Sequence, residues 1–123
     1  MQIVAKYKHV AAAAALTLLW TGAAYAGPEG RYNLAGTNPG GTGSYRGTVS
    51  VVAKGKAYDV VWKIGNARYT GVGVYTDTDF SVAYYGSNLT GVAVYRQQAD
   101  GSWTGVWAVK GSGRLGREVW TPR

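Results

Sequence analysis

The sequence feature that most constrains the fold is the alternation of short apolar runs and turns over residues 57–110. Runs rich in valine, tyrosine and tryptophan are separated by turns rich in glycine, asparagine and aspartate, which is typical of an antiparallel β-meander. The triplet Thr-Gly-Val occurs three times, beginning at Thr70, Thr90 and Thr104. The spacings of 20 and 14 residues are unequal. They therefore favour repeated hairpins over an internal duplication.

The same rhythm continues on both sides of this segment and predicts eight strands in all. Each expected strand has a two-residue period of apolar and polar side chains, and no segment after residue 27 has a helical period. Short sequential turns favour an all-β fold, a small eight-stranded antiparallel up-and-down barrel, because closure removes exposed sheet edges. A two-sheet sandwich is the alternative. The expected strands cover residues 30–36, 44–54, 58–64, 68–75, 80–85, 89–97, 103–110 and 117–121.

Glycine and aromatic residues share one face of these strands. Gly105, for example, lies between Trp103 and Trp107 on the same face. Glycine inside a strand marks a sharp bend or a close approach, and small barrels alternate small and large residues in their interior. We therefore assign this face to the interior. The opposite face carries Val72, Val92 and Val106 and is also apolar. Two alternatives therefore remain open: this face could be the interior, or it could be an outer wall of the barrel that contacts a partner.

Residues 1–26 have the features of a secretory signal peptide. Lys6 and Lys8 give a positive start, residues 10–20 form an apolar run, and Ala-Tyr-Ala at residues 24–26 is a small-x-small cleavage site. An apolar N-terminal helix of the domain is the alternative, and a membrane anchor is disfavoured because the run is shorter than the ~20 residues that span a bilayer. We expect a β-barrel domain over residues 27–123 in a periplasmic or secreted protein. An outer-membrane barrel is disfavoured because several expected strands are shorter than roughly 9–11 residues.

The expected domain lacks the side chains that most catalytic and metal sites use. The only histidine is His9, inside the expected signal peptide, and there is no cysteine. Nucleophile–base pairs and the nitrogen and sulfur ligands of zinc are therefore missing, and we expect no enzyme, metal or cofactor. Without Lys6 and Lys8, 11 basic and 6 acidic residues leave a net charge of +5, which is spread along the chain. Such a spread is typical of a solvated surface, and nucleic acid is not an expected partner.

The carboxylates are interpreted as structural. Asp77 and Asp79 lie in one turn and Asp100 in another, where aspartate bonds the local backbone. Paired glycosidase carboxylates would instead face each other across a cleft. Glu118 follows Arg117 in the last expected strand, and we expect it to pair with a basic neighbour.

The number of aromatic residues is the one unusual feature of the composition. Residues 27–123 hold four tryptophans, eight tyrosines and one phenylalanine. They can fill the core, line a pocket at the mouth of the barrel, where barrels commonly hold ligands, or form a flat surface for a glycan or a protein. The candidate ligand-binding residues are Trp62, Tyr75, Tyr95, Trp103 and Trp107.

Several segments resemble small exported proteins of Gram-negative bacteria. These segments are GRYNLAGTNPGG, YRGTVSV, YDVVWKIG, TGVAVY, DGSWTGVW and GREVW. The family resembled has no assigned activity, and some members carry a fibronectin-binding label. The resemblance covers nearly all of residues 27–123 and implies a fold more than a function. The order of strands and turns is also similar to avidin-like and lipocalin-like barrels, at the level of fold alone.

Three functional hypotheses follow. The first is an exported non-enzymatic β-barrel that binds an unknown small molecule, glycan or extracellular protein. The second is a surface or adhesive protein that binds host matrix or an envelope component through an exposed wall. The third is an enzyme. A concave pocket lined by Trp62 and Trp107 favours the first, a filled interior with an exposed valine strip favours the second, and a carboxylate that meets arginine or tyrosine in a cleft favours the third.

Overall fold

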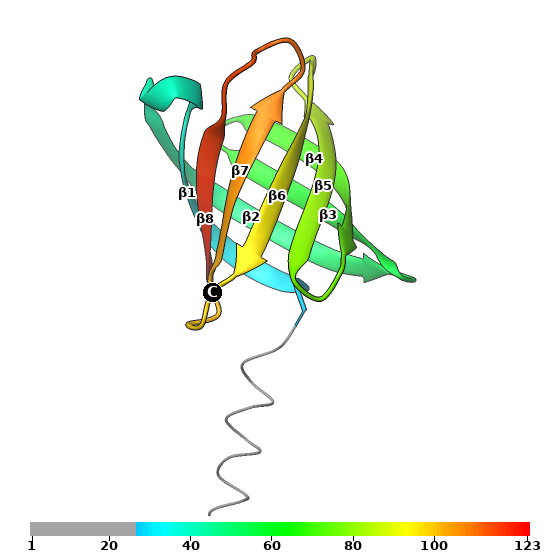
Figure 1. Ribbon diagram of the computed structural model, residues 1–123. Helices are drawn as coiled ribbons and strands as arrows, with labels where there is room; N and C mark the ends of the chain where they lie inside the picture. Colours follow the sequence, from blue (N-terminus) through cyan, green and yellow to red (C-terminus); the bar gives the residue numbers. More distant parts are fainter. Residues whose placement is uncertain (1–26) are drawn as a thin grey trace, which may run out of the picture.

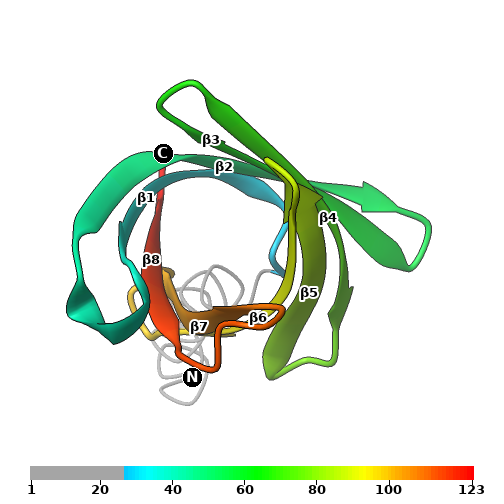
Figure 2. The same cartoon turned by 90° about the horizontal axis from the view of Figure 1, so that it is seen from above.

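A computed structural model describes residues 27–123, which form a closed antiparallel barrel of eight strands in up-and-down order. Every strand pairs with its neighbours in sequence, and β1 pairs with β8 to close the cylinder (Figures 1 and 2). The predicted fold class is confirmed. The expected signal peptide, residues 1–26, lies outside the described residues. Within residues 27–123, no helix is long and apolar enough to cross a membrane.

The strands follow one another with short connections. Two-residue turns at Gly55-Lys56, Gly65-Asn66 and Ser87-Asn88 join consecutive strands. Gly65, Ser87 and Asn88 have positive φ, as hairpin turns of this length require. The connection over residues 38–43 contains one turn of 3-10 helix. The elements are β1 (Gly30–Thr37), η1 (Pro39–Gly41), β2 (Ser44–Lys54), β3 (Ala57–Ile64), β4 (Ala67–Tyr75), β5 (Asp79–Gly86), β6 (Leu89–Gln97), β7 (Trp103–Val109) and β8 (Gly116–Pro122).

The face that carries glycine and aromatic residues is the interior, as predicted. Its buried residues form one continuous cluster along the barrel axis, and most of the partly buried side chains packed against the cluster are aromatic. Burial of this apolar surface is the main driving force for folding. The buried members are Tyr32, Leu34, Val49, Val51, Val60, Trp62, Phe80, Val82, Ala93, Tyr95, Trp103 and Trp120.

Glycines on the interior face make room for the rings of neighbouring strands. A ring and a glycine are register partners in each of four cross-strand pairs, and a Cβ atom added at the glycine would collide with the ring. The glycine therefore sets where each ring lies on the barrel wall, a pairing also used to stabilise designed sheets. The four pairs are Gly36 with Tyr45, Gly91 with Tyr84, Gly105 with Tyr95, and Gly116 with Trp107.

Substitution of one such glycine tests this packing. A Cβ atom at Gly105 would meet the Tyr95 ring and the carbonyl oxygen of Val94. We expect Gly105→Ala to lower the free energy of unfolding by about 1–3 kcal/mol, the usual cost of overpacking. The measurement is urea unfolding followed by tryptophan fluorescence. In the control, Gly43→Ala, the added Cβ meets only Asn38 at 3.4 Å. Equal stability of the two variants would contradict the packing role.

Candidate ligand-binding site

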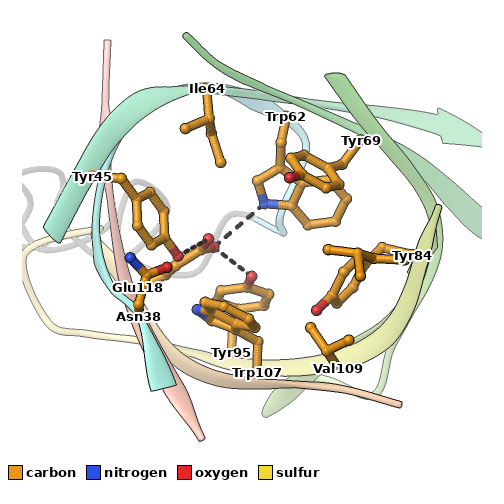
Figure 3. A pocket seen from close by; sticks show the side chains of 11 residues that line it. Asn38, Tyr45, Trp62, Ile64, Tyr69, Tyr84, Tyr95, Trp107, Val109 and Glu118 are labelled. Atoms are coloured by element: carbon orange, nitrogen blue, oxygen red, sulfur yellow. Dashed lines mark hydrogen bonds between the residues drawn. The ribbon is translucent and has the colours of Figure 1, made fainter. Parts of the chain in front are cut away.

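One end of the barrel encloses an open cavity of about 230 Å³. It lies at the end where the β1–β2, β3–β4, β5–β6 and β7–β8 connections meet, the top of Figure 1. Rings from six strands, β2 to β7, surround it, and Glu118 is the single charged residue in its lining (Figure 3). The lining residues are Asn38, Tyr45, Trp62, Ile64, Tyr69, Tyr84, Leu89, Tyr95, Trp107, Val109 and Glu118.

The opposite end of the barrel is filled by side chains and by the start of the domain. Pro28 is fully buried there, and its carbonyl accepts a hydrogen bond of 2.7 Å from the Tyr32 hydroxyl. Phe80 packs edge-on against Tyr58 and Trp103, with ring centroids 5.6 and 6.2 Å apart. The interior is therefore asymmetric: one end is a packed core and the other is hollow.

Glu118 lies at the inner side of the cavity, with only 6% of its surface exposed. Its Oε1 atom accepts hydrogen bonds from the Tyr95 hydroxyl at 2.7 Å, from Trp120 Nε1 at 3.0 Å and from Trp62 Nε1 at 3.4 Å. Its Oε2 atom accepts one, from the Tyr45 hydroxyl at 2.7 Å. A carboxylate is an acceptor only and offers about four lone-pair sites. Oε1 therefore has three donors, whereas Oε2 has one.

The partners of Glu118 correct the expectation that it pairs with a basic neighbour. Along β8 the side chains alternate, so Arg117 is exposed on the outer face while Glu118 points inward. Among residues 27–123, the one ion pair joins Arg96 to Asp79, at 2.9 Å on the outer surface. Glu118 is held instead by neutral phenol and indole donors from β2, β3 and β6 and from its own strand.

Trp107 brings a second polar atom to the cavity. Its Nε1 is buried and donates no hydrogen bond to any group within the described residues. The ring packs edge-on against Tyr45, with centroids 6.3 Å apart. A buried N–H group without an acceptor costs free energy. Trp107 Nε1 is therefore an available donor at the cavity wall.

The structure brings three of the five candidate binding residues together. Trp62, Tyr95 and Trp107 line the cavity. Tyr75 and Trp103 do not line it; they pack on each other at the filled end, with ring centroids 5.9 Å apart. The alternation of side chains indicates the interior face but not the height along the axis, and these two residues share the face but not the height of the cavity.

Sequence reasoning missed Glu118, Tyr45, Tyr69 and Tyr84 as lining residues. A signal for Glu118 was present: it lies two residues from Trp120, in phase with it on a two-residue period, while Arg117 is out of phase. The tyrosines carried a similar signal, because each is in phase, on a two-residue period, with the interior residues of its strand.

Of the aspartates assigned to turns, Asp100 bonds the local backbone as predicted, whereas Asp79 lies at the start of β5 and pairs with Arg96. Asp77 has φ of 73° and accepts the Tyr75 hydroxyl at its backbone carbonyl. Asp100 accepts hydrogen bonds from the amide and hydroxyl of Ser102, which lower the pKa of the aspartate carboxyl. The part of the chain that the structure describes holds no group of three or more acidic or histidine side chains suited to a metal ion.

Burial raises the pKa of three tyrosines that line the cavity. Desolvation by burial, and after it the nearby Glu118 carboxylate, raises the pKa of Tyr84 from its ordinary value of 10.0 to about 12. The same two causes also raise the pKa of Tyr45 and the pKa of Tyr95. These phenols remain protonated donors at neutral pH, so they are poor bases and poor nucleophiles.

Alkaline titration tests this environment. Because the folded-state pKa values lie above the unfolded value near 10, the folded barrel keeps protons that the unfolded chain loses. The stability contributed is therefore complete below about pH 10 and declines as the pH rises above it. We expect the tyrosinate absorption of the native protein to show a late step near pH 12, absent from Tyr84→Phe. Titration of all eight phenols near pH 10 in a protein that stays folded would contradict the geometry.

Removal of the carboxylate tests its structural role. Glu118→Ala deprives two hydroxyls and two indole N–H groups of their acceptor. Hydrogen bonds to a charged group contribute about 1.5–3 kcal/mol each, so we expect the free energy of unfolding to fall by at least about 3 kcal/mol. Urea unfolding measures it. Asp59→Ala, on the exposed face of β3, is the charge-matched control and should change stability little. A similar small loss for both variants would show that the network contributes little.

Comparisons with known proteins do not assign this chain to a family. Neither a comparison with protein-family models nor a comparison with curated protein sequences finds a match to the chain. The candidate site therefore stands on its own residues.

Proposed function

We propose that the protein is an exported, non-enzymatic β-barrel that binds a small ligand in the aromatic cavity at its open end. The observation that carries this proposal is the asymmetry of the interior. Trp62 and Trp107 line a cavity open at one end, whereas Phe80 and Trp103 are completely buried at the other. A barrel that needed its aromatics only as core would gain stability by filling both ends, because close packing is the norm in protein interiors.

The cavity size limits the ligand. A volume of about 230 Å³ lies just below the roughly 300–1,000 Å³ of pockets that hold drug-sized molecules. At about 30 Å³ per water molecule in the liquid, it corresponds to roughly eight waters. The lining is mainly aromatic, with few polar groups. This combination supports a small molecule with a flat apolar body over a long glycan chain.

The contact of a carboxylate with tyrosines is the feature that favours an enzyme, and Glu118 makes it twice, with Tyr45 and Tyr95. Two observations favour binding instead. Burial raises the pKa of both phenols, which keeps them from acting as bases at neutral pH. The cavity lining also contains no serine, threonine or lysine that could serve as a nucleophile.

The outer wall supports the second candidate, a surface or adhesive protein. Val72 and Val92 lie in one cross-strand row with Ala83 between them, and they are 53% and 61% exposed. Val74 and Val94 form a parallel row through Ser81, 56% and 40% exposed. A contiguous apolar patch is typical of a contact surface. It supports binding of host matrix or an envelope component, in line with the fibronectin-binding label of the family that the sequence resembles.

Native mass spectrometry of protein purified from its own periplasm tests the cavity as the binding site. Val109 lines the cavity, so Val109→Trp should fill it, whereas Val52→Trp adds the same ring at a site on β2 that is 49% exposed. We expect an additional small mass on the wild type and on Val52→Trp, and its loss from Val109→Trp.

Two results would contradict the proposal. One is a bare protein mass for all three forms. The other is retention of the additional mass by Val109→Trp. In either case the outer wall would become the leading candidate surface.

A further inference from the structure

The cavity combines one buried carboxylate with aromatic walls, and we propose that its ligand is a small organic cation, an ammonium or amidinium group on a flat apolar body. This inference rests on the proposed function and names the class of ligand. Its first support is the charge of the lining. Glu118 is the single ionisable acid or base there apart from tyrosines, and no basic side chain lines the cavity.

The second support is the uneven use of the two carboxylate oxygens. Oε1 accepts three hydrogen bonds, from Tyr95, Trp120 and Trp62. Oε2 accepts only one, from Tyr45. Because each carboxylate oxygen has about two lone-pair sites, Oε2 retains one for a further donor. A charged N–H donor makes a stronger hydrogen bond to a carboxylate than a neutral one does.

The third support is the arrangement of rings beside Glu118. Figure 3 shows Tyr45, Trp62 and Tyr84 arranged around the space beside Glu118. Trp62 packs against Tyr84 with ring centroids 5.7 Å apart, and Tyr69 packs edge-on against Tyr84 at 6.4 Å. Cations are attracted to the faces of tryptophan and tyrosine, and the attraction is greater in a desolvated site. An aromatic enclosure with one acid therefore favours a cation over a neutral molecule of the same shape.

Positive charge on the protein lies outside this enclosure. Arg46 and Arg117 border a second hollow, formed around β1, β2 and β8, that also reaches Tyr45 and Glu118. Both arginines are exposed on the outer face, so solvent screens them more than it screens Glu118 inside. They lower the attraction for a cation at long range. The contact with Oε2 and the rings decides the preference at short range.

The free Nε1 of Trp107 adds one detail. It is a buried donor without an acceptor, and it belongs to the cavity lining. A cation that also carries an acceptor atom could satisfy both groups at once. An anion could satisfy Trp107 alone and would be repelled by Glu118.

Binding of three matched probes tests the ligand class in the wild-type protein. Benzylammonium, benzyl alcohol and benzoate share a ring and differ in charge. The readout is the set of four indole N–H resonances after residue 26 in ¹⁵N-labelled protein. We expect benzylammonium to shift the Trp107 and Trp62 resonances and to bind at least tenfold more tightly than benzyl alcohol. Benzoate should bind most weakly. The Trp103 resonance, at the filled end, is the internal control and should not move.

Glu118→Gln supplies the second measurement, because it keeps the shape of the side chain and removes its charge. We expect the preference for benzylammonium over benzyl alcohol to fall to less than threefold. Asp59→Asn removes one charge from the exposed face of β3 and should leave the preference unchanged. If Glu118→Gln does not fold, the wild-type comparison of the three probes still decides the question.

The outcomes separate the two proposals. If benzyl alcohol or benzoate binds as tightly as benzylammonium and shifts the Trp107 resonance, the cation preference is wrong and the cavity remains a binding site. If none of the probes moves the Trp62 and Trp107 resonances, the cation proposal fails. The native mass measurements on Val109→Trp then show whether the cavity binds anything else.

Discussion

A carboxylate inside a barrel is tolerated only where donors replace the water that it loses, because a buried and unpaired charge is very costly. Glu118 meets this condition with four side chains, from β2, β3, β6 and its own strand β8. β3 and β6 pair neither with each other nor with β8, so their side chains reach Glu118 only across the interior. The network and the closed barrel therefore depend on each other. The network gives the closed barrel one specific polar arrangement in an otherwise apolar interior.

The positions of the aromatic rings divide the interior into a filled end and a hollow end. At the filled end Phe80, Trp103 and Tyr58 pack edge to face, and Pro28 closes the space. Around the cavity, hydrogen bonds and glycine partners fix where the rings lie, and space remains between them. The Tyr84 hydroxyl, for instance, donates to the carbonyl of Ala108 on β7 at 3.2 Å. A side chain anchored at its tip by a hydrogen bond is restrained from moving into the cavity.

The sequence predicted the fold further than it predicted the site. Alternation and turn residues were enough for eight strands and barrel closure, and the glycines of β4, β6 and β7 were enough for the interior face. Height along the axis was not predictable, because it depends on the register of all eight strand pairs. This is why Tyr75 and Trp103 were grouped with Trp62, although they lie at the filled end. The adjacency of Glu118 to Arg117 suggests a basic partner, whereas its two-residue phase with Trp120 indicates the inward direction that the structure has.

The account depends most on Glu118 pointing inward and holding the indole of Trp120, which is completely buried. Hydrogen exchange at Trp120 Nε1, followed by NMR in the wild-type protein, tests this most directly. We expect this proton to exchange only through global unfolding, with the same free energy of opening as the slowest backbone amides of the barrel. Exchange at the rate of a solvent-exposed indole, in a protein whose strand amides stay protected, would contradict it.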